Sequence, residues 1–180
     1  MILRCTGKLL TLLGERPSSL TERLPTDDDW YANLLWLDRR KCPLLVHGAT
    51  LFPVFAADVR KAGPTPIGDV VARLIQNELR NEDLPAETFG RLDPGAVILA
   101  KTASRVVLGY MNEMARFCEY GVLADGGLEH CDARNLNRQL RRELHLSRQP
   151  PGYFLPIELV RAGKAGIAAP EQRPRLRVLS

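Results

Sequence analysis

Long apolar runs are missing from this sequence of 180 residues. It has no stretch of about 18 consecutive apolar residues, so no segment is a candidate for a membrane-spanning helix. The apolar start, MILRCTGKLLTLLG, is interrupted by Arg4 and Lys8 and is not followed by a cleavage site of small residues. It is therefore a poor signal peptide, and we expect a cytoplasmic protein without a membrane partner.

Common catalytic and metal-binding motifs are also absent. The sequence contains no GxSxG, HExxH or GxGxxG, and no CxxC or HxxxH pair that could begin a zinc site. Its cysteines are few and widely spaced, which favours buried, reduced thiols over a disulfide framework. They are Cys5, Cys42, Cys118 and Cys131. We expect no metal and no cofactor, and the balance favours a protein without catalytic activity.

Positive charge is unevenly distributed along the chain. The formal net charge is +4. Residues 161–180 contain five basic residues and one acidic residue, which leaves 20 of each sign in the other 160. We therefore expect a single domain over 1–160, electrically balanced, followed by a basic and flexible C-terminal tail over 161–180.

The order of predicted elements favours an α+β domain. Strands come first, and later helices alternate with single strands, which is typical of a mostly antiparallel sheet of five or six strands with three or four helices. Hydrophobic periodicity and turn residues predict the elements. Strands are expected over 2–6, 31–37, 42–47, 50–56, 96–100 and 152–160, and helices over 7–14, 65–82, 102–121 and 132–145. Pro53 indicates an edge strand or a bulge, and the apolar run 96–100 indicates a fully buried strand. Gly14 is expected to end its helix and Asp132 to cap the last one.

Two near-matches to phosphate-binding loops fail on spacing. A cysteine-phosphatase loop needs an arginine six positions after the cysteine, but Asn137 stands there after Cys131, and Arg138 is one position late. The segment GAVILAKT resembles a P-loop, but Ala100 replaces the glycine before the lysine, and the residues ahead of it favour a strand. Polar residues still gather where the following helix begins and along it, as the candidates for an enzyme site. They are Lys101, Ser104, Arg105 and Asn112.

The most basic predicted helix is the one after Asp132. Ala133, Leu136, Leu140 and Leu144 follow helical spacing on one face. The basic residues fall on the other faces, where they could contact the phosphates of nucleic acid. They are Arg134, Arg138, Arg141 and Arg142. The alternative is a solvated helix whose arginines pair with carboxylates elsewhere in the fold.

Three blocks of the sequence resemble an uncharacterised bacterial family, a "domain of unknown function" family of small cytoplasmic proteins. The blocks are MILRCTGKLL, WYANLLWLDRRK and AKTASRVVLGYMNEM. The resemblance covers about residues 1–160 and implies a cytoplasmic bacterial protein. It assigns no activity and no catalytic residue.

Three functions remain open on the sequence alone. Our preferred interpretation is a small binding or regulatory module with an anionic partner, nucleic acid among the candidates, that uses the arginine helix. The second is an enzyme of the nuclease or phosphoester-hydrolase type, toxin-like, with its site near Lys101–Arg105. The third is a protein-interaction module or homo-oligomer without chemistry.

Overall fold

A computed structural model describes residues 1–57, 66–148 and 151–163. Within them the chain forms an α+β domain with a five-stranded mixed sheet in the order β4-β3-β2-β1-β5 and a separate β6-β7 ribbon. The predicted fold class is confirmed. The strands are β1 Ile2–Cys5, β2 Trp30–Leu37, β3 Arg40–His47, β4 Pro53–Phe55, β5 Ile98–Lys101, β6 His145–Arg148 and β7 Pro151–Phe154. The α-helices are α1 Gly7–Leu13, α2 Ile67–Asn81, α3 Arg105–Ala124, α4 Ala133–Leu140 and α5 Pro156–Arg161.

The sheet is mixed because its halves are connected differently. β1 runs parallel to both β2 and β5, whereas β2, β3 and β4 pair antiparallel through short connections. The β2–β3 turn consists of Asp38 and Arg39, both with positive φ, as a two-residue turn between twisted strands requires. The turn is shorter than the predicted charged connection, because Arg40 and Lys41 already belong to β3.

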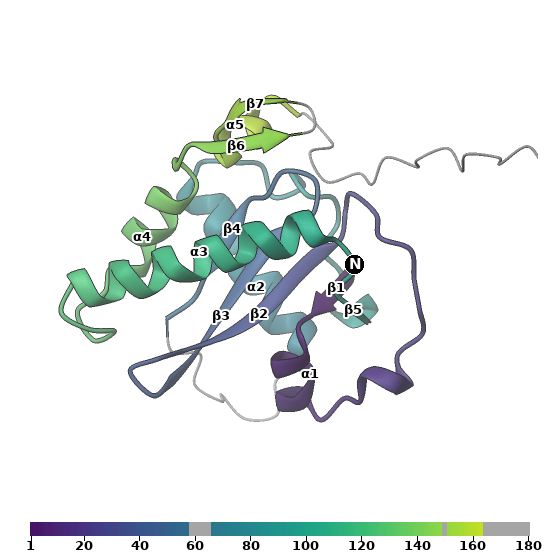
Figure 1. Cartoon of the computed structure of the whole chain (residues 1–180). Coiled ribbons are helices and arrows are strands. Elements are labelled where there is room, and N and C mark those ends of the chain that lie inside the picture. Colours follow the sequence, from purple (N-terminus) through teal and green to yellow (C-terminus); the bar gives the residue numbers. More distant parts are fainter. Residues whose placement is uncertain (58–65, 149–150, 164–180) are drawn as a thin grey trace, which may run out of the picture.

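Helices cover both faces of the sheet (Figure 1). α3 and α4 pack on one face, where Tyr31 and Leu44 contribute to a core with Met111 and Leu136. α1 and α2 pack on the other face, where Trp30 belongs to a second core. The alternation of side chains along β2 separates the two cores, since Tyr31 and Leu35 face α3 while Trp30 and Leu34 face away.

Several predicted boundaries were wrong for physical reasons. β5 was expected to be fully buried, but it is an edge strand whose only buried residue is Ala100. The strand predicted over 152–160 ends at Phe154, because Pro156 begins α5 there. Helix α3 continues past Gly121, where a Cβ would lie 2.7 Å from Leu136 Cδ1, so this glycine permits α4 to pack closely rather than ending the helix.

Two further findings bear on the predicted domain and compartment. No helix in the described ranges is long and apolar enough to cross a membrane. The predicted tail begins at Arg161, which is the last residue of α5, and its residues 164–180 lie outside the described part of the chain. The expectation that the tail is flexible therefore stays a prediction.

Candidate functional site

Helix α4 lies beside the edge strand β4, and the predicted arginines are on this helix and in the two residues after it. Asp132 caps the helix, its side chain accepting a hydrogen bond from the Asn135 backbone N–H at 3.0 Å. Leu136 and Leu140 are buried against α3 and the sheet. The helix ends at Leu140, shorter than predicted, so Leu144 lies outside it and is exposed.

Asn137 attaches α4 to the edge strand β4. Its side-chain amide donates to the Phe55 carbonyl at 2.7 Å, and its carbonyl oxygen accepts from the Phe55 N–H at 2.7 Å. This buried amide reproduces the pair of hydrogen bonds that a further strand would make. It thereby covers part of the sheet edge that would otherwise be open to pairing. Pro53, the first residue of β4, confirms the prediction of an edge strand.

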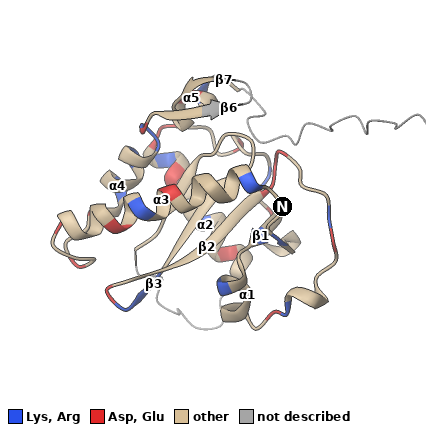
Figure 2. Ribbon diagram, viewed as in Figure 1, with Lys and Arg blue, Asp and Glu red and all other residues tan. Residues whose placement is uncertain are grey.

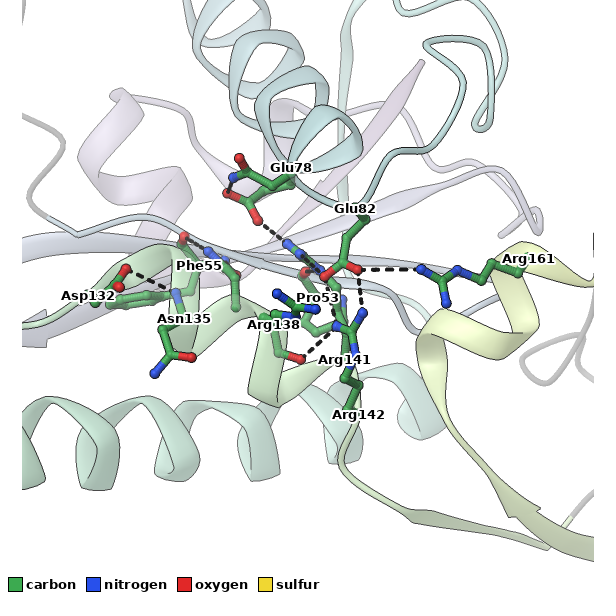
Figure 3. A network of polar contacts seen from close by, with 12 residues as sticks. Pro53, Phe55, Glu78, Glu82, Asp132, Asn135, Arg138, Arg141, Arg142 and Arg161 are labelled. Carbon is green, nitrogen blue, oxygen red and sulfur yellow. Dashed lines mark hydrogen bonds and ion pairs between the residues drawn. The ribbon is translucent and has the colours of Figure 1, made fainter.

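Arg141 lies inside the protein rather than on its surface. Its side chain has 0% exposure and forms an ion pair with Glu78 and a second with Glu82, whose Oε1 lies 3.0 Å from Arg141 Nη1. Its Nε donates to the Pro53 carbonyl at 3.2 Å, and its guanidinium lies 4.5 Å from the centre of the Phe52 ring. Figure 3 shows this network between α2, β4 and α4. Arg141 therefore anchors the helix, and a surface partner does not reach it in this arrangement.

Glu82 is the centre of the network. Its side chain is 3% exposed, and besides Arg141 it accepts two hydrogen bonds from Arg142, at 2.9 and 2.6 Å. Arg161, from α5, lies 3.9 Å from Glu82 Oε2. Burial alone would raise the pKa of Glu82, but the hydrogen bonds from Arg142 and Arg141 outweigh it and hold this pKa below its usual value. Glu82 is therefore ionised at neutral pH.

Arg134 and Arg138 have a different environment from Arg141. Both side chains are exposed, and neither forms an ion pair with a described residue. Arg134 and Arg138 are four residues apart, which places them on one side of α4 about 6 Å apart. Arg142 is four residues further along, just after the helix, and is half-buried. Along α3, acidic and basic residues alternate (Figure 2). The predicted set of four therefore divides into a buried anchor, Arg141, and the α4 row, which is Arg134 and Arg138 on the helix and Arg142 after its end.

The predicted enzyme residues do not form a bonded cluster. Ser104 caps α3 by accepting from the Val107 N–H at 3.3 Å. Lys101, Arg105 and Asn112 are exposed, and no hydrogen bond or ion pair joins these four side chains within the described ranges. The Lys101 carbonyl accepts from Arg4, at 3.0 Å. The group therefore shows the ordinary capping of a helix and no assembled acid–base pair.

Arg4 is a buried polar residue that was not among the predicted site residues. It forms an ion pair with Asp29, and its Nη2 donates to the carbonyls of Arg23 and Leu24 at 3.0 and 2.8 Å. These bonds attach the loop before β2 to β1, an inner strand of the sheet. In the sequence, Arg4 stands within the otherwise apolar strand segment ILRC, and this is the signal that could have revealed a buried arginine.

A second buried polar group lies between α3 and β6. The rings of Tyr110 and His145 are 4.7 Å apart, and Glu113 Oε2 lies 3.6 Å from His145 Nδ1. Neither the Tyr110 hydroxyl nor His145 Nε2 has a hydrogen-bond partner among the described residues. Burial lowers the pKa of His145, although Glu113 and Glu143 oppose this, and burial also raises that of Tyr110. Both rings are therefore neutral at pH 7 and fasten the β6-β7 ribbon to α3.

The remaining reactive groups are the thiols. The side chains of Cys5, Cys42 and Cys118 are buried, and that of Cys131 is half-buried. Burial, together with Asp125, raises the pKa of the Cys131 thiol to about 11, which disfavours the thiolate that a nucleophile needs. No group of three or more His, Cys, Asp or Glu suited to a metal ion occurs in the described part of the chain.

Comparisons with known proteins give one match. A family model described as "Domain of unknown function (DUF6933)" matches residues 2–159. No curated protein and no solved structure matches the chain. The match covers all strands and helices from β1 to β7 and ends within α5, before Arg161.

Proposed function

We propose that the chain, which belongs to the DUF6933 family of domains of unknown function, is a binding module for an anionic partner, with nucleic acid as the partner class. The observation that carries the proposal is the α4 row, with Arg134 and Arg138 on the exposed side of α4 and the half-buried Arg142 after its end. Arginine side chains on a regular support suit a phosphate backbone, whose charges repeat along the strand.

The buried network supports this proposal by making α4 rigid. Arg141 and Asn137 fix the helix to β4 and α2 through four protein groups, which are Pro53, Phe55, Glu78 and Glu82. A helix held in this way presents Arg134 and Arg138 in a fixed register. Such a support lowers the entropy lost when the arginines bind.

The charge balance sets the expected strength of binding. Glu82 already compensates Arg142 in part, and Arg134 and Arg138 remain without a carboxylate among the described residues. Two full phosphate contacts correspond to weak binding that depends strongly on salt. For duplex DNA we expect the slope of log K against log salt to contain a contribution of about −1.8 from these two arginines.

The test is fluorescence anisotropy with labelled DNA and RNA, single-stranded and duplex, over a range of potassium chloride concentrations. Replacing both residues, Arg134→Gln and Arg138→Gln, should reduce the salt slope by about 1.8. The matched control replaces two exposed arginines away from α4, Arg73→Gln and Arg91→Gln, and changes the net charge equally. No binding at low salt, or equal losses in both double variants, would refute the proposal.

A second candidate, association with another copy of this chain, is favoured by the outer side of the β6-β7 ribbon. Leu144, Leu146 and Tyr153 are exposed there, and Leu146 pairs with Tyr153 across the two strands. An exposed apolar group of this kind is typical of a contact surface. Analytical ultracentrifugation should then give a dimer that Leu146→Ser and Tyr153→Ser convert to a monomer. A monomer at all concentrations would exclude this candidate.

A further inference from the structure

Two arginines from different elements meet at the C-terminal end of the α4 row. Arg142 follows α4, and Arg161 is the last residue of α5, but both reach Glu82 Oε2, at 2.6 and 3.9 Å. Figure 3 shows the two side chains approaching this carboxylate from different directions. Both guanidinium groups therefore lie within contact distance of the same carboxylate oxygen, so a single anion can reach both.

The two guanidinium groups keep hydrogen-bond donors in reserve. An arginine has five N–H donors. Arg142 uses two on Glu82 and one on the Arg138 carbonyl at 3.0 Å, which leaves two of the five. Arg161 makes only the 3.9 Å contact with Glu82 in the described part of the chain, so its donors are open. Their side chains are 32% and 55% exposed, so an anion from solvent can approach both.

The charges of the network favour a further anion. Three arginines, Arg141, Arg142 and Arg161, face two carboxylates, Glu78 and Glu82, which leaves one positive charge in excess. Because both carboxylates are largely buried, the excess lies on the solvent side, with Arg142 and Arg161. Glu82 also holds Arg142 in place by a two-bond contact, and a guanidinium fixed in this way loses little entropy when it binds.

We infer that Arg142 and Arg161 form a binding site for a phosphomonoester group, such as the terminal phosphate of a nucleic-acid strand. A phosphomonoester carries a charge of about −1.5 to −2 at pH 7, whereas each internal phosphate of a strand carries one. Paired guanidinium groups match the former and single arginines along a helix match the latter. The inference rests on the proposed function, since the terminal phosphate would lie at the end of the α4 row.

The test compares two oligonucleotides of identical sequence, one with a 5′-phosphate and one with a 5′-hydroxyl, together with a free nucleoside monophosphate. We expect the phosphorylated strand to bind about tenfold more tightly, which corresponds to one additional charge-assisted contact. Arg161→Gln should abolish this preference without changing the affinity for the hydroxyl strand. Arg134→Gln with Arg138→Gln should instead weaken both strands equally and leave the preference intact.

The outcomes separate the two proposals. Equal binding of the two strands overturns the phosphate site while the α4 row stands. If neither strand binds, the proposed function fails. The phosphate site is then tested by titration with inorganic phosphate, followed by NMR of the arginine side chains. Saturable shifts at Arg142 and Arg161 support the site, and unchanged signals overturn it. If the free monophosphate binds as tightly as the phosphorylated strand, the site stands and its ligand is a free nucleotide. Because Arg161 is more than half exposed, its variant tests the site even if Arg142→Gln does not fold.

Discussion

Replacing Arg141 by methionine should destabilise the protein strongly while removing no surface charge. The variant keeps much of the side-chain volume, but it leaves Glu78 without the arginine that it pairs with in the interior. Glu82 still has Arg142 and Arg161, so the loss falls mainly on one carboxylate. Breaking a buried ion pair on one side costs about 3–5 kcal/mol. Because Glu82 keeps its other partners, we expect Arg141→Met to lower the free energy of unfolding by about 3 kcal/mol. This is a large share of the 5–15 kcal/mol typical of a folded domain.

Urea unfolding followed by the fluorescence of Trp30 and Trp36 measures this loss. The exposed neighbour provides the control, because Arg138→Met should change the free energy of unfolding by less than about 0.5 kcal/mol. The double variant Arg141→Met, Glu78→Leu removes both charges and should be more stable than Arg141→Met alone. A loss below about 1 kcal/mol for Arg141→Met, or a double variant less stable than the single one, would refute the reasoning that Arg141 is an anchor.

Two other predictions concern stability. Burial lowers the pKa of His47 from 6.5 to about 4, although Asp29 opposes this. As the pH falls, His47 is therefore protonated in the unfolded chain before it is protonated in the folded protein. About 3 kcal/mol of stability is lost between pH 6.5 and pH 4. His47→Phe should remove this loss from the pH dependence of urea unfolding. Gly68→Ala should destabilise the protein by about 1–3 kcal/mol, because its Cβ would lie 2.2 Å from the Pro94 carbonyl oxygen, whereas Gly109→Ala on α3, with nothing within 4 Å, should stabilise it by up to about 1 kcal/mol. Thermal unfolding of the two glycine variants would contradict this if their midpoints shifted in the same direction.

Local patterns in the sequence were enough for the elements that are defined by local chemistry. The apolar stripe of α2 and the capping residues Asp132 and Gly14 are confirmed, because each depends on neighbours within a few positions. The position of β5 depends instead on which strand lies beside it. Its apolar sequence predicted a fully buried strand, but no strand among the described residues covers its outer side, and Ile98 is exposed. Edge and centre are properties of the assembled sheet, so composition alone does not separate them.

The candidate site was limited by the same difference between local and long-range information. Helical spacing placed Arg138 and Arg141 together on the polar side of α4, yet one is exposed and the other fully buried. What separates them is Glu78 on α2 and Glu82 at its end, which are 63 and 59 residues from Arg141 in the sequence. A partial signal existed, since Glu78 lies within the buried stripe of α2 and Glu82 follows it at a spacing of four. This signal could not identify the partner of the two carboxylates. Pairing them with Arg141 requires knowing that α2 and α4 meet at β4. A basic helix therefore favours nucleic-acid binding only through the arginines that remain after such internal partners are assigned. Here these are Arg134 and Arg138 on α4 and, in part, Arg142 after its end.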